Sequence, residues 1–305
     1  MKKILLFGKS GQVGWELQRS LSVLGEVIAL DFDSTHLCGD FTNPAGLLAT
    51  VYAVQPDIIV NAAAHTAVDK AESEPDLART INTAAPAALA QAAAALGAWL
   101  VHYSTDYVFD GRGQTPWVET DVTAPLSVYG HTKREAEQLI AASNCNHLIF
   151  RTSWVYAARG GNFAKTMVKL AKERDSLSVI NDQFGAPTGA DLLADATAHA
   201  LRRVCAQPEQ HASDDSSLSG LYHLVAGGHT SWHGYAQFVI QTATQAGVEL
   251  KVLPQAIAAV PTSSYPTPAR RPSNSRLNTG KFQQVFGLNL PPWQQGVTRM
   301  LAETL

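Results

Sequence analysis

Up to residue 155, short apolar runs alternate with longer segments of helical spacing, and this alternation limits the fold more than any other feature. Ile4–Phe7 has the length of a buried strand, and apolar residues recur near helical spacing just after it. The pattern predicts strands at Ile4–Phe7, Val27–Leu30, Asp57–Val60, Trp99–Tyr103 and His147–Phe150, separated by helices at Gln12–Leu24, Asn43–Val54, Glu74–Leu96 and Tyr129–Ala142. Such alternation predicts an α/β fold with a doubly wound parallel sheet of the Rossmann type.

After residue 155 the alternation loosens, which predicts a large lobe over residues 1–155 and a smaller lobe mainly over residues 156–305. We expect the two lobes to enclose a cleft, and the chain can return to the first lobe later. The polar segment Gln207–Ser219 predicts an exposed, mobile loop. The later elements expected are helices at Phe163–Lys172, Ala190–Val204, Tyr235–Ala246 and Trp293–Leu301, and strands at Leu177–Ile180, Leu221–Val225 and Val248–Leu253.

Charge and cysteine content narrow the class of protein. The net charge of the 305 residues is −3 and 46% of them are hydrophobic, which gives no electrostatic reason to expect nucleic acid or a membrane as partner. The apolar run at Ile4–Phe7 is too short for a secretory signal. Cys38, Cys145 and Cys205 are odd in number and lack metal-ligand spacing, so we expect reduced thiols and a cytoplasmic protein.

A glycine-rich loop, Gly8-Lys-Ser-Gly11-Gln-Val-Gly14, lies between the first strand and the first helix. Glycines there allow backbone to approach a pyrophosphate, which sits at the positive end of the helix. Asp31 ends the second strand, where a carboxylate accepts hydrogen bonds from the adenosine ribose. Residues 1–155 are therefore expected to form an NAD(P)-binding domain, with Asp40-Phe41 and Asn61–Ala64 lining the cofactor.

The charge of Asp31 also bears on the choice of cofactor. A carboxylate repels the 2′-phosphate of NADPH and so favours NADH. Lys9 in the loop partly offsets that repulsion, and NADPH stays open.

Tyr129 and Lys133 stand four residues apart, on one face of a predicted helix. A free phenol has a pKa of about 10, too high for efficient proton exchange at neutral pH. We expect the lysine cation, together with the oxidised nicotinamide ring, to lower that pKa. Thr105 and Asp106 follow the preceding strand at the sheet edge where ligands of open α/β sheets bind, so the Thr105 hydroxyl is expected to hydrogen-bond a substrate carbonyl.

These motifs together resemble those of the extended short-chain dehydrogenase/reductases, and more narrowly the dTDP-4-dehydrorhamnose reductase family. The resemblance covers essentially the whole chain. Besides the glycine loop, it rests on Asn61-Ala-Ala-Ala-His-Thr-Ala-Val-Asp69, Ser104-Thr-Asp-Tyr-Val-Phe-Asp-Gly111, Tyr129-Gly-His-Thr-Lys133, Arg151-Thr-Ser-Trp-Val-Tyr156, Asn181-Asp-Gln-Phe-Gly-Ala-Pro-Thr188, Tyr222-His-Leu-Val-Ala-Gly-Gly228 and Arg271-Pro-Ser-Asn-Ser275.

The resemblance implies the reduction of dTDP-4-dehydro-6-deoxy-L-mannose to dTDP-L-rhamnose, with hydride from NADH or NADPH and residues 156–305 mainly binding the sugar nucleotide. Tyr129 would donate the proton, Lys133 would hold the nicotinamide ribose, and Thr105 would orient the ketone. The substrate contacts implied are Thr105, Asp106, Trp154, Arg271 and Asn274. The cofactor contacts implied are Gly8, Ser10, Gly11, Gln12, Val13, Gly14, Asp31, Asp40, Phe41, Ala63, Ala64, His65, Tyr103, Tyr129 and Lys133.

Some members of this family are homodimers with magnesium held by carboxylates at the interface. Glu16 and Asp191 match two such positions, but Gln294 stands where a third acidic residue is expected. Losing a charged oxygen ligand weakens a site for a hard cation, so a magnesium site is not favoured here.

Two alternatives remain open from the sequence. A nucleotide-sugar epimerase or dehydratase keeps the fold but recycles its cofactor within a turnover, and Thr105-Asp106 partly resembles the acidic pair of a dehydratase. A non-catalytic, NAD(P)-binding regulatory subunit is the other. Retention of Thr105, Tyr129 and Lys133 together favours an enzyme, and NADH oxidation with the keto sugar nucleotide separates the possibilities.

Overall fold

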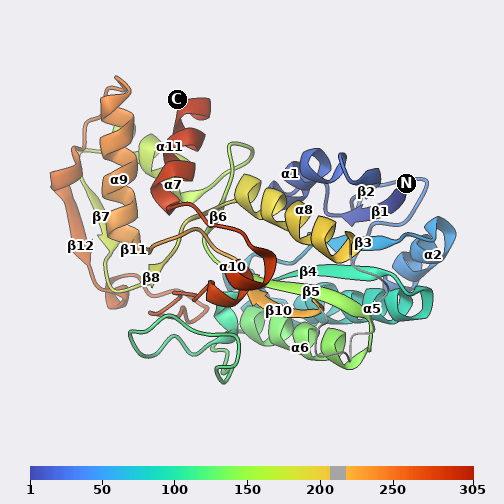
Figure 1. Ribbon diagram of the computed structural model, residues 1–305. Coiled ribbons are helices and arrows are strands. Elements are labelled where there is room, and N and C mark those ends of the chain that lie inside the picture. The colour runs from blue at the N-terminus through green and yellow to red at the C-terminus, as the bar shows by residue number, and fades with distance from the viewer. Residues whose placement is uncertain (207–217) are drawn as a thin grey trace.

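A parallel sheet forms the centre of the larger lobe in the computed structural model, which describes residues 1–206 and 218–305 (Figure 1). Within these residues the sheet has six strands in the order β2-β1-β3-β4-β5-β10, and every pairing is parallel. The strands are β1 (Lys2–Phe7), β2 (Gly25–Leu30), β3 (Ile58–Asn61), β4 (Trp99–Thr105), β5 (Asn146–Thr152) and β10 (Gly220–His223). The predicted α/β fold is confirmed.

Helices cover both faces of this sheet (Figure 1). One face packs on α1 (Gln12–Leu21), α8 (Ala190–Ala206) and α10 (Gly280–Phe286), and the other on α2 (Pro44–Val54), α5 (Ala85–Leu96) and α6 (Val128–Ala142). The alternation of side chains along β1 explains both layers, since Ile4 and Leu6 enter the first core and Leu5 and Phe7 the second.

The smaller lobe has its own apolar core, built around Tyr235, Val239 and Val297. Its helices are α7 (Phe163–Glu173), α9 (Trp232–Gln245) and α11 (Trp293–Thr304). Its strands form three short pairs: β6 (Val155–Tyr156) with β9 (Thr188–Gly189), β7 (Leu177–Ile180) with β12 (Ile257–Val260), and β8 (Phe184–Gly185) with β11 (Thr230–Ser231).

The division of the chain at residue 155 stays a prediction. α8, β10 and α10 all follow that residue, yet they pack on the large sheet. No helix among the described residues has the length and apolar character needed to cross a bilayer.

Two predicted elements differ from the structure. The helix expected at Glu74–Leu96 is α4 (Pro75–Arg79), a π-helical turn η1 (Thr80–Ala84) and α5, and it is preceded by α3 (Val68–Ser73). The strand expected at Val248–Leu253 is a loop whose Lys251 amide bonds the Ala171 carbonyl, so its apolar residues reflect packing against α7.

The remaining short elements are 3₁₀ turns. They are η2 (Asp106–Val108), η3 (Pro254–Ala256) and η4 (Thr262–Ser264). Most of the loop expected at Gln207–Ser219 lies outside the described residues.

Candidate active site

A cleft of about 1370 Å³ lies at the carboxyl edge of the sheet and reaches residues of the smaller lobe. The strand order reverses between β1 and β3, and ligands of open α/β sheets bind at such a point. Most of the predicted site residues line this cleft: Gly8, Ser10, Gly11, Gln12, Val13, Asp31, Asp40, Phe41, Ala63, Ala64, Tyr103, Thr105, Asp106, Tyr129, Lys133 and Trp154.

Two glycines make the loop after β1 compact. Gly8 has a φ of +85°, and a Cβ there would come within 2.7 Å of the Ala63 nitrogen. A Cβ on Gly14 would come within 1.9 Å of the Gly8 carbonyl oxygen, so α1 packs on the loop only because residue 14 is glycine. Gly11 begins α1 without a side-chain cap. The first amides of α1 are therefore suited to binding an anion.

Asp31 lies at the end of β2, beside this loop. Its carboxylate accepts hydrogen bonds from the Ser10 amide at 3.0 Å, from the Ser10 hydroxyl and from the Phe32 amide. Partial burial works to raise the pKa of Asp31, but these hydrogen bonds, with smaller help from Lys9, hold it below its ordinary value. A charged carboxylate beside an anion-binding helix end fits the ribose and pyrophosphate of a dinucleotide.

Tyr129 and Lys133 both project from α6, whose start is capped by the Ser127 hydroxyl accepting from the Gly130 amide at 3.2 Å. Burial raises the pKa of Tyr129 to about 12, while the Thr105 hydroxyl works to lower it. From the sequence we expect the pKa of Tyr129 to be lowered. In the protein without cofactor it is raised instead, because the loss of water around the phenolate outweighs the other effects. A neutral phenol is the form that donates a proton.

Lys133 is 2% exposed. Burial lowers its pKa to about 7, although the Glu137 carboxylate works to raise it. The amine donates to the Tyr103 carbonyl at 2.6 Å and lies 3.1 Å from His102 Nε2. Burial thus favours the uncharged amine of Lys133 far more than water favours it for an exposed lysine.

Thr105 and Asp106 stand at the end of β4. The Thr105 hydroxyl accepts from the Tyr107 amide and donates to Asp106 Oδ1, both at 3.1 Å. Burial raises the pKa of Asp106 to about 6, against hydrogen bonds from Ser275 and Thr105. Among the described residues Asp106 Oδ2 has no partner, although it is buried. A buried acceptor at a cleft wall is suited to a ligand hydroxyl.

Trp154 follows β5 and stacks on Trp232 of the smaller lobe, with ring centroids 3.6 Å apart. Both indoles line the cleft. The φ of Trp154 is +48°, a costly conformation for a bulky side chain. A Cβ at Gly185 would come within 2.7 Å of the Trp154 ring, so glycine makes room for this stack.

Besides Gly14, three predicted ligand contacts lie away from the cleft lining. The His65 ring faces Glu74 at 3.7 Å, and its backbone bonds Asn82. Arg271 pairs with Asp69 at 2.7 Å. Asn274 is 1% exposed, and its amide nitrogen donates to the Thr115 carbonyl. The side chain of Asn274 is thus occupied by hydrogen bonds within the protein, and we assign it no substrate contact.

Each of the two carboxylates considered for magnesium lies near an arginine. Glu16 pairs with Arg19 at 3.4 Å and Asp191 with Arg299 at 3.7 Å. Within the described part of the chain, no group of three or more His, Cys, Asp or Glu side chains could hold a metal ion. A neighbouring arginine offsets part of the charge that attracts a hard cation, and a magnesium site at Glu16 and Asp191 stays disfavoured as a prediction.

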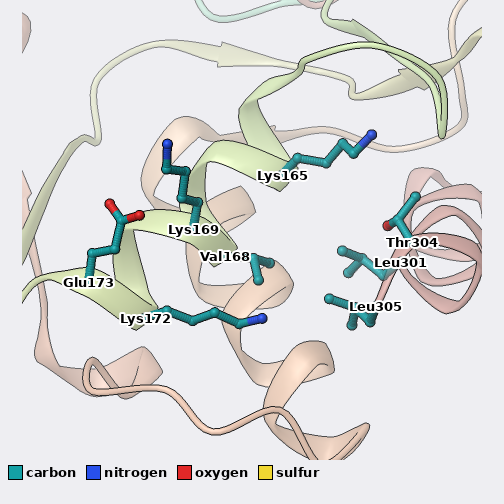
Figure 2. A pocket seen from close by; sticks show the side chains of 8 residues that line it. All are labelled: Lys165, Val168, Lys169, Lys172, Glu173, Leu301, Thr304 and Leu305. Carbon is teal, nitrogen blue, oxygen red and sulfur yellow. The ribbon is translucent and has the colours of Figure 1, made fainter.

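Sequence reasoning missed several residues that line the cleft, among them Phe32, Tyr107, Arg159, Gly160 and Trp232. The Gly160-Gly161 pair signals a loop, and Gln12 donates to the Gly161 carbonyl at 3.1 Å across the cleft mouth. No sequence signal pointed to Trp232. Figure 2 shows a second hollow between α7 and α11, which holds none of the predicted catalytic residues and is lined by Lys165, Val168, Lys169, Lys172, Glu173, Leu301, Thr304 and Leu305.

Comparison with known proteins agrees with this geometry. A dTDP-4-dehydrorhamnose reductase of Shigella flexneri is 62% identical over 300 residues, covering 98% of this chain and 97% of that protein. The one from Escherichia coli (strain K12) is 61% identical over the same shares. The crystal structure of dTDP-4-dehydrorhamnose reductase from Bacillus anthracis in complex with NADP is 32% identical, with a TM-score of 0.85 over 100% of both chains. A family model described as the RmlD substrate binding domain matches residues 1–305, and this chain belongs to that family.

Proposed function

We propose that this protein reduces the 4-keto group of dTDP-4-dehydro-6-deoxy-L-mannose to give dTDP-L-rhamnose, the last step of dTDP-rhamnose biosynthesis. The observation that carries the proposal is the placement of Tyr129, Lys133 and Thr105 in one cleft with the glycine loop. Relatives at 61% and 62% identity over nearly the whole chain bear the name of this reductase.

Tyr129 is the proton donor in this proposal. Its pKa of about 12 keeps the phenol protonated at neutral pH, and the Thr105 hydroxyl lies beside it. As the ketone is reduced, negative charge develops on its oxygen, and the basicity of that oxygen rises until it takes the phenolic proton. Thr105 orients the same oxygen by a hydrogen bond, for which its hydroxyl turns from Asp106 Oδ1.

The glycine loop, Asp31 and Lys133 are suited to hold NADH or NADPH. The amides at the start of α1 would bind the pyrophosphate, Asp31 the adenosine ribose, and Lys133 the nicotinamide ribose. When bound, the cofactor supplies the hydride for the reduction. Both forms stay open, since Asp31 disfavours a 2′-phosphate and the relative from Bacillus anthracis is in complex with NADP.

Asp106 and Trp154 are placed to bind the sugar. Asp106 Oδ2, which has no partner among the described residues, would accept a hydrogen bond from a sugar hydroxyl. The Trp154 indole offers an apolar face in the same cleft. Arg271, now paired with Asp69, reaches the nucleotide only if that pair opens. We also propose a cytoplasmic location, in keeping with the free cysteines of the described chain, and the homodimer stays a prediction.

The test is NADPH and NADH oxidation, followed by absorbance, with dTDP-4-keto-6-deoxy-L-mannose and with its UDP counterpart. Tyr129→Phe should lower turnover about 10²–10⁴-fold and leave cofactor affinity nearly unchanged. Tyr107→Phe is the comparison variant, since it removes a second phenol hydroxyl from the same cleft, on a ring whose centroid lies 5.7 Å from that of Tyr129. An undiminished rate in Tyr129→Phe, or full activity without net cofactor oxidation, would overturn the proposal.

A further inference from the structure

Behind Lys133 lies a chain of buried polar groups that the mechanism above leaves unused. Asn61 ends β3 and His102 lies on β4, and each is 1% exposed. Asn61 Nδ2 is 3.0 Å from His102 Nδ1, and His102 Nε2 is 3.1 Å from Lys133 Nζ. The three side chains therefore run in series from the cofactor loop after β3 to the predicted catalytic lysine.

One backbone amide sets the direction of every hydrogen bond in this series. The Ala63 amide donates to Asn61 Oδ1 at 2.9 Å, so the NH₂ group of Asn61 is the one that faces His102. An amide NH₂ only donates, and His102 Nδ1 must therefore accept. A neutral imidazole then carries its proton on Nε2.

This tautomer has a consequence for Lys133. The Nε2 proton of His102 points at Lys133 Nζ, and an ammonium group has no lone pair with which to accept it. The arrangement is satisfied only by the uncharged amine, which accepts from His102 and donates to the Tyr103 carbonyl at 2.6 Å.

We propose that Asn61 and His102 are positioning residues that stabilise Lys133 as an uncharged amine, so that Lys133, each time solvent protonates it, readily passes that proton on to Tyr129 after a reduction. The proton balance is simple. Tyr129 gives its phenolic proton to the substrate oxygen and becomes a phenolate. Solvent protonates the Lys133 amine, the resulting ammonium group passes one proton on to the phenolate, and Lys133 returns to the amine that His102 stabilises. The catalytic part of this inference rests on the proposed function.

The charged groups around the series do not supply this stabilisation. Glu137 on α6 favours the ammonium form, but its carboxylate is bound to Arg151 on β5 at 2.7 Å and to the Ser104 hydroxyl at 2.5 Å. Burial holds the pKa of His102 well below its ordinary value, so the imidazole stays neutral whichever form Lys133 takes. Burial of Lys133 and the direction of the hydrogen bond from His102 are therefore what favour the amine.

The first test needs no substrate. Long-range ¹H–¹⁵N spectra report the histidine tautomer, and lysines labelled with ¹³C at Cε report their own titration; Lys133→Met and His102→Gln assign the signals. We expect His102 to be neutral with its proton on Nε2 between about pH 6 and 9, and Lys133 to titrate near neutral pH. A proton on His102 Nδ1, or a cationic imidazole, overturns the proposal in the wild-type protein.

The second test reverses the direction of the series with Asn61→Asp. The new carboxylate still accepts from the Ala63 amide but now also accepts from His102 Nδ1, which turns Nε2 into an acceptor for the ammonium group. The pKa of Lys133 should rise by at least about one unit. Asn82→Asp is the control, because it adds a carboxylate beside α6 at a residue that bonds Thr132 and not His102.

An equal rise of the Lys133 pKa in both variants, or no rise in Asn61→Asp, counts against the proposal. In turnover assays, the alkaline fall of kcat should move upward with the Lys133 pKa in Asn61→Asp. If the protein turns over no keto sugar, the proposed function fails while the tautomer and titration still decide this inference.

Discussion

Replacing Lys133 by methionine should make the protein more stable while removing its activity. Lys133 is 2% exposed, and burial holds its pKa at about 7 instead of the ordinary 10.5. Methionine is similarly long and unbranched, and it removes the ionisable group. The expected gain in stability follows from the difference between the pKa of Lys133 in the native protein and its pKa in the unfolded chain.

The magnitude follows from linkage. A pKa near 7 in place of 10.5 means that the unfolded chain binds the proton more tightly, by about 4 to 5 kcal/mol. Between these two values the unfolded state carries more protons, so the free energy of unfolding rises with pH across that window. The destabilisation of the native state by Lys133 is therefore complete below about pH 7, and it disappears as the pH approaches 10.

The substitution also removes two hydrogen bonds. The Tyr103 carbonyl and the His102 Nε2 proton lose their partner, at a cost of about 1 to 2 kcal/mol each. The net gain at about pH 6 is thus on the order of 1 to 2 kcal/mol. The pH dependence is larger than this net value, because the lost hydrogen bonds do not titrate.

Urea unfolding of both proteins at several pH values measures this difference. The stability advantage of Lys133→Met should shrink by about 2 to 3 kcal/mol from pH 6 to pH 9. Lys133→Arg is the matched control, since it keeps a charge that stays protonated throughout. A difference between wild type and Lys133→Met that stays constant with pH would refute the reasoning.

Three further predictions concern acidic side chains. Asp31→Ala should weaken NADH binding about 10- to 100-fold and NADPH binding less, as measured by fluorescence titration. Glu137→Gln should cost about 3 to 5 kcal/mol in urea unfolding, because it strands the buried Arg151, whereas Glu135→Gln, at an exposed ion pair, should change little. Asp106→Asn should raise the free energy of unfolding at pH 7 but not near pH 4, since the native pKa of about 6 exceeds the ordinary 3.8 and the cost appears as pH rises through that window.

Local patterns were enough to predict the large sheet and much of the cleft. The glycine loop, Asp31 and the Tyr129–Lys133 pair each lie within a few residues of a strand or helix end, so short-range spacing places them. In a parallel sheet the carboxyl ends of all strands share one edge. Residues that follow different strands, such as Thr105, therefore meet without any knowledge of long-range contacts.

Other parts of the site depend on contacts that the sequence does not encode locally. Trp232 reaches the cleft by stacking on Trp154, 78 positions earlier in the chain, and the φ of +48° at Trp154 has no sequence signal. Nothing in the sequence distinguishes His102 from the other residues of its buried strand. The sequence errs in the other direction at Asn274. This residue matches a family motif, but its side-chain amide donates a hydrogen bond to the Thr115 carbonyl. The pKa of Tyr129 likewise depends on its burial, which spacing along a helix does not give.

The energetic costs of this fold gather at one edge of the sheet. Lys133 and Asp106 are both buried with pKa values displaced toward neutrality, in opposite directions, and Trp154 holds a costly backbone conformation beside them. The cost at Lys133 is relieved as pH rises and the cost at Asp106 as pH falls, so near neutral pH the chain bears both. Packing alone would favour apolar residues at both positions. The edge of the sheet that carries these costs is the edge at which Tyr129 and the glycine loop meet, and this energetic argument for the active site is independent of any relative.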